Sequence, residues 1–302
     1  MSGKIHKNDC PIRPIISAPG TYNYNLAKYL NELLTNAVSN DKFILKDTFD
    51  FLNKISKIEL TEGDSLISFD VISLFTNVPI DETINIIKKR FFNNGRLLDQ
   101  MNFKTFEKLL RQCVQKSHFI FNKQFYEQCD GVSMGSPLGP VLASIFMNDF
   151  ELKHMSKLKE LGVTTWFRYV DDTFVVINNN KPTEVLNFLN SLHNSIKFTC
   201  EHEINNSINF LDVTITRKHL KLVTKTYHKP TFTGVFLNWN SLTSRKYKIG
   251  LIHCLLDRVS KICSENEEKN LEKQKLKSVF LSNNYPEHIL NSEFDKFEKY
   301  QK

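Results

Sequence analysis

The chain has 302 residues, 41% of them hydrophobic and 12% aromatic, and its formal net charge is +7 at pH 7. This length and composition exclude an intrinsically disordered chain and leave room for two or three lobes. The mild basic excess is compatible with a polyanionic partner but does not identify one.

Neither secretion nor membrane insertion is expected. No apolar run approaches the ~18 residues of a membrane span, and the N-terminus lacks the apolar core of a signal peptide. The six cysteines form no CxxC pair, and the histidines do not complete a zinc-type spacing. We therefore expect a soluble intracellular protein with reduced thiols and no structural zinc site.

The first part of the chain begins with a basic segment and continues with helical spacing. Residues 1–20 contain two lysines, one arginine and three prolines, which predict either a basic, strand-rich flap or a frayed terminus. From 22 to about 58, apolar residues recur at helical intervals and predict core-facing helices. Ser65–Asp70 (SLISFD) then predicts a short strand that ends in an acid.

Helices, a hairpin and a glycine-rich loop are predicted next. Residues 84–116 are helical in pattern, with acids at the expected helix start, and Phe119–Phe125 predicts a hairpin. Gly131–Pro140 (GVSMGSPLGP) leads into a predicted helix over 141–157. Small residues before a helix let the backbone approach a ligand closely, although many such loops are only tight connections.

Two adjacent acids lie in the following predicted hairpin. Asp171 and Asp172 stand between the apolar runs Trp166–Val170 and Thr173–Ile177, which are rich in aromatic and β-branched residues. Two carboxylates at a turn repel each other unless a cation or hydrogen-bond donors lie between them. The alternative is an ordinary solvated turn that happens to be acidic.

Strands and then helices are predicted for the remaining part. A helix is expected over 185–192, and a separate, Lys-rich helical lobe is expected over 244–302. The stretches with strand patterns are 196–203, 208–217, 221–228 and the turn-and-strand segment 226–236.

Asp70 resembles the acidic pair in its position, since it too stands at the end of a predicted strand. If the two strands are neighbours in a sheet, the three carboxylates meet and supply only hard oxygen ligands, which suit Mg²⁺ and argue against zinc or copper. Two Mg²⁺ ions would clamp the attacking and leaving oxygens of an in-line phosphoryl transfer. Arg13 has the guanidinium geometry to hold a phosphate bidentately.

Six ordered motifs give the chain a resemblance to a known family. They are KIHK with PIRPIIS (4–17), SFDVISLFTNVP (68–79), MGSPLGPVLAS (134–144), RYVDDTFVV (168–176), IKFTCEHE with NFLDVTI (196–215) and YHKPTF (227–232). In this order they resemble the reverse transcriptases of Penelope-like retroelements, a class of retrotransposon. The resemblance implies an RNA-directed DNA polymerase, a nucleotidyltransferase that joins dNTPs to the 3′-hydroxyl of a DNA primer on an RNA template. It implies neither a membrane nor a protein partner.

The resemblance also implies an α+β fold with the architecture of a right-hand polymerase. The fingers would comprise residues 1–60, the palm 61–235 with a fingers insertion at about 85–125, and the helical thumb 236–302. The palm would be ferredoxin-like with an antiparallel sheet, and the thumb would hold a duplex through its phosphates. Family members usually have more sequence before KIHK, and many carry a GIY-YIG endonuclease after the thumb. We therefore expect a truncated chain with an incomplete start of the fingers and no endonuclease domain.

The catalytic residues implied by the resemblance are the three acids. Asp70, Asp171 and Asp172 would ligate two Mg²⁺ ions, with Mn²⁺ as the alternative metal and with help from the Val71 carbonyl. Phe75 would exclude a ribose 2′-hydroxyl, unless it is an ordinary core aromatic.

Further residues are implied to contact nucleotide or primer. Those at the incoming nucleotide would be Arg13, Phe75, Met134 and Gly135, with Lys4, Lys7 and Lys197 as weaker candidates. Lys197 is equally compatible with a solvated strand lysine. His228 and Lys229 would grip the primer, although a basic surface explains Lys229 as well.

Two other functions compete with an active reverse transcriptase. One is an inactive, truncated relic that keeps the fold and nucleic-acid binding, which the intact set of three acids disfavours. The other is an RNA-dependent RNA polymerase, which Phe75 disfavours because those enzymes usually have an acid at this place. A nuclear location is expected from the life cycle of retroelements and not from any signal in the chain.

Overall fold

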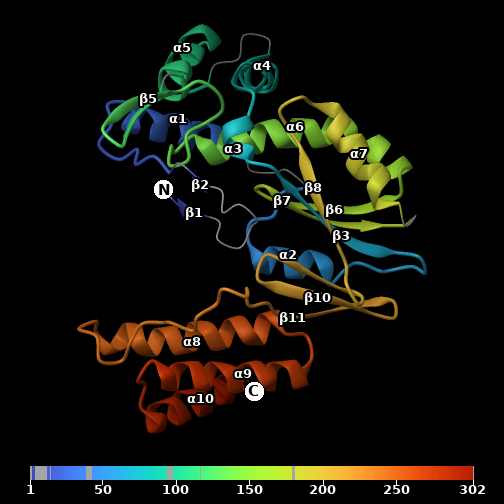
Figure 1. Cartoon of the computed structure of the whole chain (residues 1–302), viewed down its shortest axis with the longest axis vertical. Coiled ribbons are helices and arrows are strands. Elements are labelled where there is room, and N and C mark those ends of the chain that lie inside the picture. The colour runs from blue at the N-terminus through green and yellow to red at the C-terminus, as the bar shows by residue number, and fades with distance from the viewer. Residues whose placement is uncertain are drawn as a thin grey trace. The chain divides into compact units, whose positions relative to one another are not determined.

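The computed structural model describes residues 2–3, 12–13, 15–38, 43–93, 98–115, 117–178 and 181–301. The chain divides into two compact units. Unit 1 comprises Met1–Ile44 and Ile67–Glu201, and unit 2 comprises Leu45–Leu66 and His202–Lys302. Helices and strands occur in both units, so the class is α+β as predicted (Figure 1). The finer division into fingers, palm and thumb stays a prediction.

The glycine-rich loop separates the helices and strands into two sets. The set that precedes it is β1 (Ser2–Gly3), β2 (Ile12–Arg13), α1 (Tyr24–Val38), α2 (Thr48–Ile55), β3 (Ser65–Val71), α3 (Leu74–Asn77), α4 (Ile80–Phe91), α5 (Phe103–Val114), β4 (Ser117–Phe121) and β5 (Gln124–Gln128). The set that follows is α6 (Gly139–Glu160), β6 (Val163–Tyr169), β7 (Asp172–Ile177), α7 (Pro182–Leu192), β8 (Phe198–His202), β9 (Ser207–Phe210), β10 (Val213–Lys218), β11 (Lys221–Thr226), α8 (Arg245–Ile262), α9 (Asn266–Ser282) and α10 (Glu287–Gln301).

A four-stranded sheet with the order β6-β7-β3-β8 organises unit 1. The elements β3, α6, β6, β7, α7 and β8 follow one another in the β-α-β-β-α-β sequence of a ferredoxin-like fold. Strands β6 and β7 form an antiparallel hairpin in which Tyr169 is opposite Asp172. Helices α3, α4 and α5 and the hairpin β4–β5 are inserted between β3 and α6.

One large apolar core joins α6 and α7 to this sheet (Figure 1). Helix α6 is buried on most of its circumference, because its first half is an almost unbroken apolar run. In β3 the alternation of side chains turns Phe69 and Val71 into the core and leaves Ser68 and Asp70 on the opposite face. The strand therefore presents its acid outside the core.

The inserted helices have clear sequence signals at their ends. Helix α4 carries Asp81 and Glu82 in its first turn and three basic residues in its last, which matches the helix dipole at both ends. Helix α5 is capped by Asn102, whose side chain accepts a hydrogen bond from the backbone N–H of Thr105 at 2.9 Å. The predicted hairpin is present as β4–β5, and it turns at Asn122 and Lys123, both of which have positive φ.

Unit 2 contains a three-stranded antiparallel sheet and a bundle of three helices. The sheet has the order β11-β10-β9, and Phe210 of β9 packs against Phe51 of α2 with ring centroids 4.7 Å apart. Helices α8, α9 and α10 contact one another around an apolar core of their own (Figure 1). This bundle covers the stretch predicted to be helical after residue 244.

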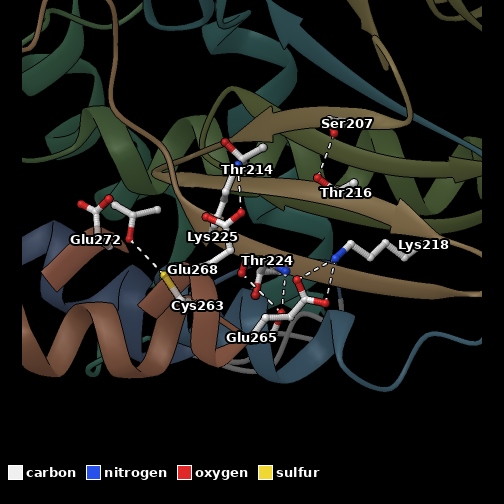
Figure 2. Close-up of polar contacts among 12 residues, drawn as sticks. Ser207, Thr214, Thr216, Lys218, Thr224, Lys225, Cys263, Glu265, Glu268 and Glu272 are labelled. Carbon is white, nitrogen blue, oxygen red and sulfur yellow. Dashed lines mark hydrogen bonds and ion pairs between the residues drawn. The ribbon is translucent and has the colours of Figure 1, made fainter. Parts of the chain in front are cut away.

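Polar contacts join β10 and β11 to the beginning of α9 (Figure 2). Lys218 Nζ donates to both carboxylate oxygens of Glu265, at 2.8 and 2.7 Å. Thr224 Oγ1 donates to the Ile262 carbonyl oxygen at 2.6 Å, and Lys225 Nζ lies 3.3 Å from Glu268 Oε1. The sheet and the bundle of unit 2 are thus connected by side-chain bonds.

The structure sets the bounds of one predicted helical stretch and corrects two predicted strand segments. The helical stretch 22–58 is divided between α1 and α2, and α2 begins after Asp47, whose side chain caps it by accepting from Asp50 N at 2.8 Å. The predicted strand 208–217 is two strands, because the chain turns at Leu211 with positive φ. Residues 227–236 form no strand, since Pro230 removes a backbone donor and Gly234 has positive φ.

Two further observations concern the whole described chain. In the part of the chain that the structure describes, no helix combines the length and apolar character needed to span a bilayer. The thiols of the five described cysteines are free, and burial raises the pKa of Cys113 and of Cys200 to about 11.

The helical bundle of unit 2 gives a direct test of its core. We expect Phe280→Ala to lower the free energy of unfolding by about 3–5 kcal/mol, because the fully buried ring contacts both Phe236 and Tyr285. The control is Leu281→Ala at the neighbouring position, where the side chain is 42% exposed and the loss should stay below about 1 kcal/mol. Urea denaturation of the full chain measures both. Equal losses would show that the bundle does not pack around Phe280.

Candidate metal centre

Three carboxylates meet at one end of the strands in the sheet of unit 1. Asp70 lies near the end of β3, and Asp171 and Asp172 lie at the turn between β6 and β7. One carboxylate oxygen from each of the three lies within 4.8 Å of the others, and none of the side chains is buried. The backbone joins the two elements directly, because Val71 N donates to the Asp171 carbonyl oxygen at 3.0 Å. The predicted meeting of the three acids is therefore present.

This donor set fits magnesium. Among the described residues, these aspartates are the one group of three or more acidic, histidine or cysteine side chains placed to bind a metal ion together. All three offer hard oxygen atoms without nitrogen or sulfur, which is the set that Mg²⁺ and Mn²⁺ prefer. Their open position leaves room for water or substrate oxygens to complete an octahedral shell.

The hairpin turn that carries the acids has an unfavourable backbone conformation. Val170 and Asp171 form a two-residue loop, and Val170 has a φ of 57°. A β-branched residue rarely adopts this left-handed conformation, and it costs on the order of 1–3 kcal/mol unless the surroundings hold it in place. Among the described residues, Val170 is the one β-branched residue with positive φ.

Phe75 lies beside the glycine-rich loop at the beginning of α6. It is half-buried, and a Cβ added at Gly139 would lie 3.4 Å from its ring, so the ring packs closely on the glycine. Its carbonyl oxygen accepts from Val132 N at 2.7 Å. Part of the side chain belongs to the edge of the core and part is accessible, which leaves both predicted roles of Phe75 open.

The glycine-rich loop is fixed at two points where only glycine fits. At Gly131, which has a φ of 71°, a Cβ would lie 2.4 Å from the Thr76 backbone. At Gly135, with a φ of 114°, it would lie 2.1 Å from the Ile16 carbonyl oxygen. Ile16 N in turn donates to the Met134 carbonyl oxygen at 2.8 Å. Met134 is half-buried and Gly135 is exposed, so this predicted nucleotide-binding pair is accessible.

The predicted basic residues have different outcomes. Lys4 and Lys7 lie outside the described residues, and Arg13 belongs to β2, where only the backbone is described. Lys197 is half-buried, and its ammonium donates to the carbonyl oxygens of Asn190 at 2.6 Å and His193 at 3.0 Å. These are carbonyls at the end of α7, so Lys197 stabilises a helix terminus in this structure. Its role at the incoming nucleotide stays a prediction.

The predicted primer-gripping pair belongs to unit 2. His228 Nε2 lies 2.5 Å from Glu272 Oε1, and its ring lies 4.7 Å from that of Phe232. Lys229 is exposed. His228 is therefore held by α9 and by an aromatic neighbour, while the Lys229 side chain points to solvent.

Sequence reasoning missed a buried group of three residues next to the acids. Arg168 Nε and Nη2 donate to the two oxygens of Glu151 at 2.6 and 3.1 Å, and Trp166 Nε1 donates to Glu151 Oε1 at 2.9 Å. The Arg168 and Glu151 side chains are 1% and 0% exposed. An arginine inside an apolar strand and a glutamate inside an apolar helix are the signals that could have predicted the pair, since each requires a buried partner.

Comparison with known proteins gives a family for most of the chain. The model of the family described as "Reverse transcriptase (RNA-dependent DNA polymerase)" matches residues 5–207, about two thirds of the chain. A second model, described as "Animal helix-turn-helix domain", matches residues 235–295. None of the curated proteins matches the chain.

Solved structures with a similar fold include two telomerases. Telomerase from Candida albicans, in complex with a fragment of telomeric RNA, matches with a TM-score of 0.58 at 14% identity, over 91% of this chain and 48% of that one. Apo telomerase from Candida tropicalis matches with a TM-score of 0.52 at 15% identity, over 92% of this chain and 51% of that one. The chain thus spans about half the length of these telomerases and has the right-hand polymerase fold.

The close approach at Gly135 generates a prediction for this loop. We expect Gly135→Ala to displace the loop and to break the bond between Ile16 and Met134, because the added Cβ would collide with a backbone oxygen. The control, Gly250→Ala, places the same methyl group in open space within α8 and should stabilise the chain by up to about 1 kcal/mol. Thermal denaturation and amide hydrogen exchange at Ile16 measure the two effects. Wild-type protection of the Ile16 amide in Gly135→Ala would contradict the prediction.

Proposed function

Because the chain belongs to the reverse transcriptase (RNA-dependent DNA polymerase) family, we propose that it copies an RNA template into DNA by adding dNTPs to a primer 3′-hydroxyl. The observation that carries this proposal is the meeting of Asp70, Asp171 and Asp172 at the open edge of the sheet. Bound there, two Mg²⁺ ions would supply the charge stabilisation that an in-line nucleotidyl transfer requires.

The residues around the acids have separate tasks in this proposal. The three aspartates hold the metals, and the Val71 segment keeps β3 in register with the acidic turn through its bond to Asp171. Phe75 closes the side of the nucleotide pocket on which a ribose 2′-hydroxyl would lie, and Met134 and Gly135 line the pocket for the incoming base. A half-buried ring fixed against Gly139 is rigid enough to exclude an additional oxygen atom.

The finer assignments belong to the same proposal. We assign the chain to the Penelope-like retroelements on the six ordered motifs, and we place its activity in the nucleus. Its partners would be an RNA template, a DNA primer and dNTPs. A telomerase of similar fold is in complex with RNA, which supports an RNA partner for this chain. Arg13, His228 and Lys229 would contact triphosphate and primer.

Primer extension tests the polymerase and the metal site together. On an oligo(dT)-primed poly(rA) template with Mg²⁺, we expect wild type to incorporate dTTP. Removing a residue that supports a metal ligand typically lowers activity by roughly 10- to 100-fold. Asp171→Asn removes a proposed ligand itself, so we expect its rate of dTTP incorporation to fall by more than that. Asp149→Asn is the control, since its carboxylate belongs to an ion pair with Lys153 on α6 and is not one of the three acids.

Three results would decide among the functions. Incorporation by wild type and Asp149→Asn but not by Asp171→Asn supports the proposal. A folded protein that binds template and primer without incorporating dTTP or the matching ribonucleotide would favour the inactive relic. A preference for the ribonucleotide would favour an RNA polymerase.

The assignment of Phe75 is tested by the sugar of the incoming nucleotide. Phe75→Val shortens the side chain, so we expect the preference for dTTP over the ribonucleotide to fall by roughly 10- to 200-fold, the range that one steric contact supplies. The kcat/KM ratio for the two nucleotides measures it. The control is Phe119→Val, which changes an aromatic residue of the β4–β5 hairpin and should leave the kcat/KM ratio unchanged. An unchanged ratio in Phe75→Val would mean that Phe75 is only a core residue.

A further inference from the structure

We propose that Arg168 is a positioning residue that fixes the metal-binding turn through a bond to the Val170 carbonyl, supported from behind by Glu151. The inference rests on the proposed function, in which Asp171 and Asp172 hold the metal ions. Arg168 touches neither metal nor substrate; it acts through the backbone that carries the two acids.

The Arg168 side chain makes bonds in two directions. Its Nε and Nη2 atoms bind the carboxylate of Glu151, and Nη1 donates to the Val170 carbonyl oxygen at 3.1 Å. One planar guanidinium therefore joins a helix to the loop of the hairpin. Its own backbone is also held, because Arg168 N donates to the Phe43 carbonyl oxygen at 2.8 Å.

The loop that Arg168 contacts has an unfavourable backbone conformation. Val170 is held at a φ of 57°, a conformation that its β-branched side chain disfavours. The bond from Val71 holds the loop at Asp171, and without the bond from Arg168 the strained residue Val170 would lose its own restraint and relax toward other conformations. The bond from Arg168 is made at the strained residue, which is where a restraint is most effective.

Glu151 connects Arg168 to helix α6. It lies on α6, whose first residue, Gly139, packs against the Phe75 ring. Helix α6 therefore contacts Phe75 at its first residue and holds the metal-binding turn further along, through Glu151 and Arg168. Phe75 and the metal-binding turn are thus both in contact with groups that α6 carries or holds.

A purely structural role would not require an arginine. Buried ion pairs are commonly replaced by apolar side chains of similar volume with little or no loss of stability. What an apolar pair cannot supply is the third arm of the guanidinium fork, which reaches the Val170 carbonyl. The two roles therefore differ in their effect on metal affinity at equal stability.

The test compares variants that disturb the group with and without removing this bond. The double variant Glu151→Leu/Arg168→Met removes the charges together and deletes the bond to Val170. The matched control, Trp166→Phe, removes one donor to Glu151 but leaves Arg168 and its bond in place. Binding of Mn²⁺ to each full-length protein is measured by the electron paramagnetic resonance signal of the free ion. Thermal denaturation gives the stability of each variant.

We expect the double variant to bind Mn²⁺ about 10-fold or more weakly than wild type, as when a residue behind a metal ligand is removed. Trp166→Phe should bind with wild-type affinity even where it is less stable. Arg168→Lys is the second variant if the double variant does not fold, since its ammonium lacks the fork and should show the same loss.

Other results would overturn the inference. Unchanged Mn²⁺ affinity in the double variant, or losses that follow stability in all variants, would show that the group only stabilises the fold. The metal site on which the proposed function rests fails differently, because wild type and Asp171→Asn would then bind Mn²⁺ equally. The two failures are therefore distinguishable in one titration.

Discussion

Repulsion among Asp70, Asp171 and Asp172 is the constraint that the rest of unit 1 satisfies. Carboxylate oxygens within 4.8 Å of one another repel by roughly 3–4 kcal/mol per pair at an effective dielectric of ~20. A chain keeps such a cluster only where packing and hydrogen bonds hold the backbone that carries it, and a bound cation then offsets the repulsion.

Three supports hold the backbone around the acids. The bond from Val71 to Asp171 keeps the two acid-bearing elements in register. The glycine-rich loop is fixed to the segment of Phe75 and to Ile16, where glycine alone permits the close approach. The buried carboxylate of Glu151 anchors the guanidinium behind the turn. Each support comes from a different part of the chain.

Sequence patterns predicted the parts of this site that depend on local rules. Alternation and composition predicted the strand ending at Asp70 and the hairpin around Asp171, and small residues predicted the loop before α6. Pairings between elements were beyond such rules. Nothing in a strand pattern states that Arg168 faces a helix, and the turn at Leu211 is marked by a single common turn residue, Asp212. The side chains that hold the site were therefore harder to predict than those that form it.

The position of the buried group along the chain has a consequence for the order of folding. Glu151 is only 15 and 17 residues from its two donors, so α6, β6 and β7 can assemble through local contacts. Asp70 stands about a hundred residues upstream and joins them only when β3 pairs with β7. Closing so long a loop is slower than forming a hairpin. We therefore expect the acidic pair to be organised early, whereas Asp70 joins it with the late, non-local pairing of β3 and β7.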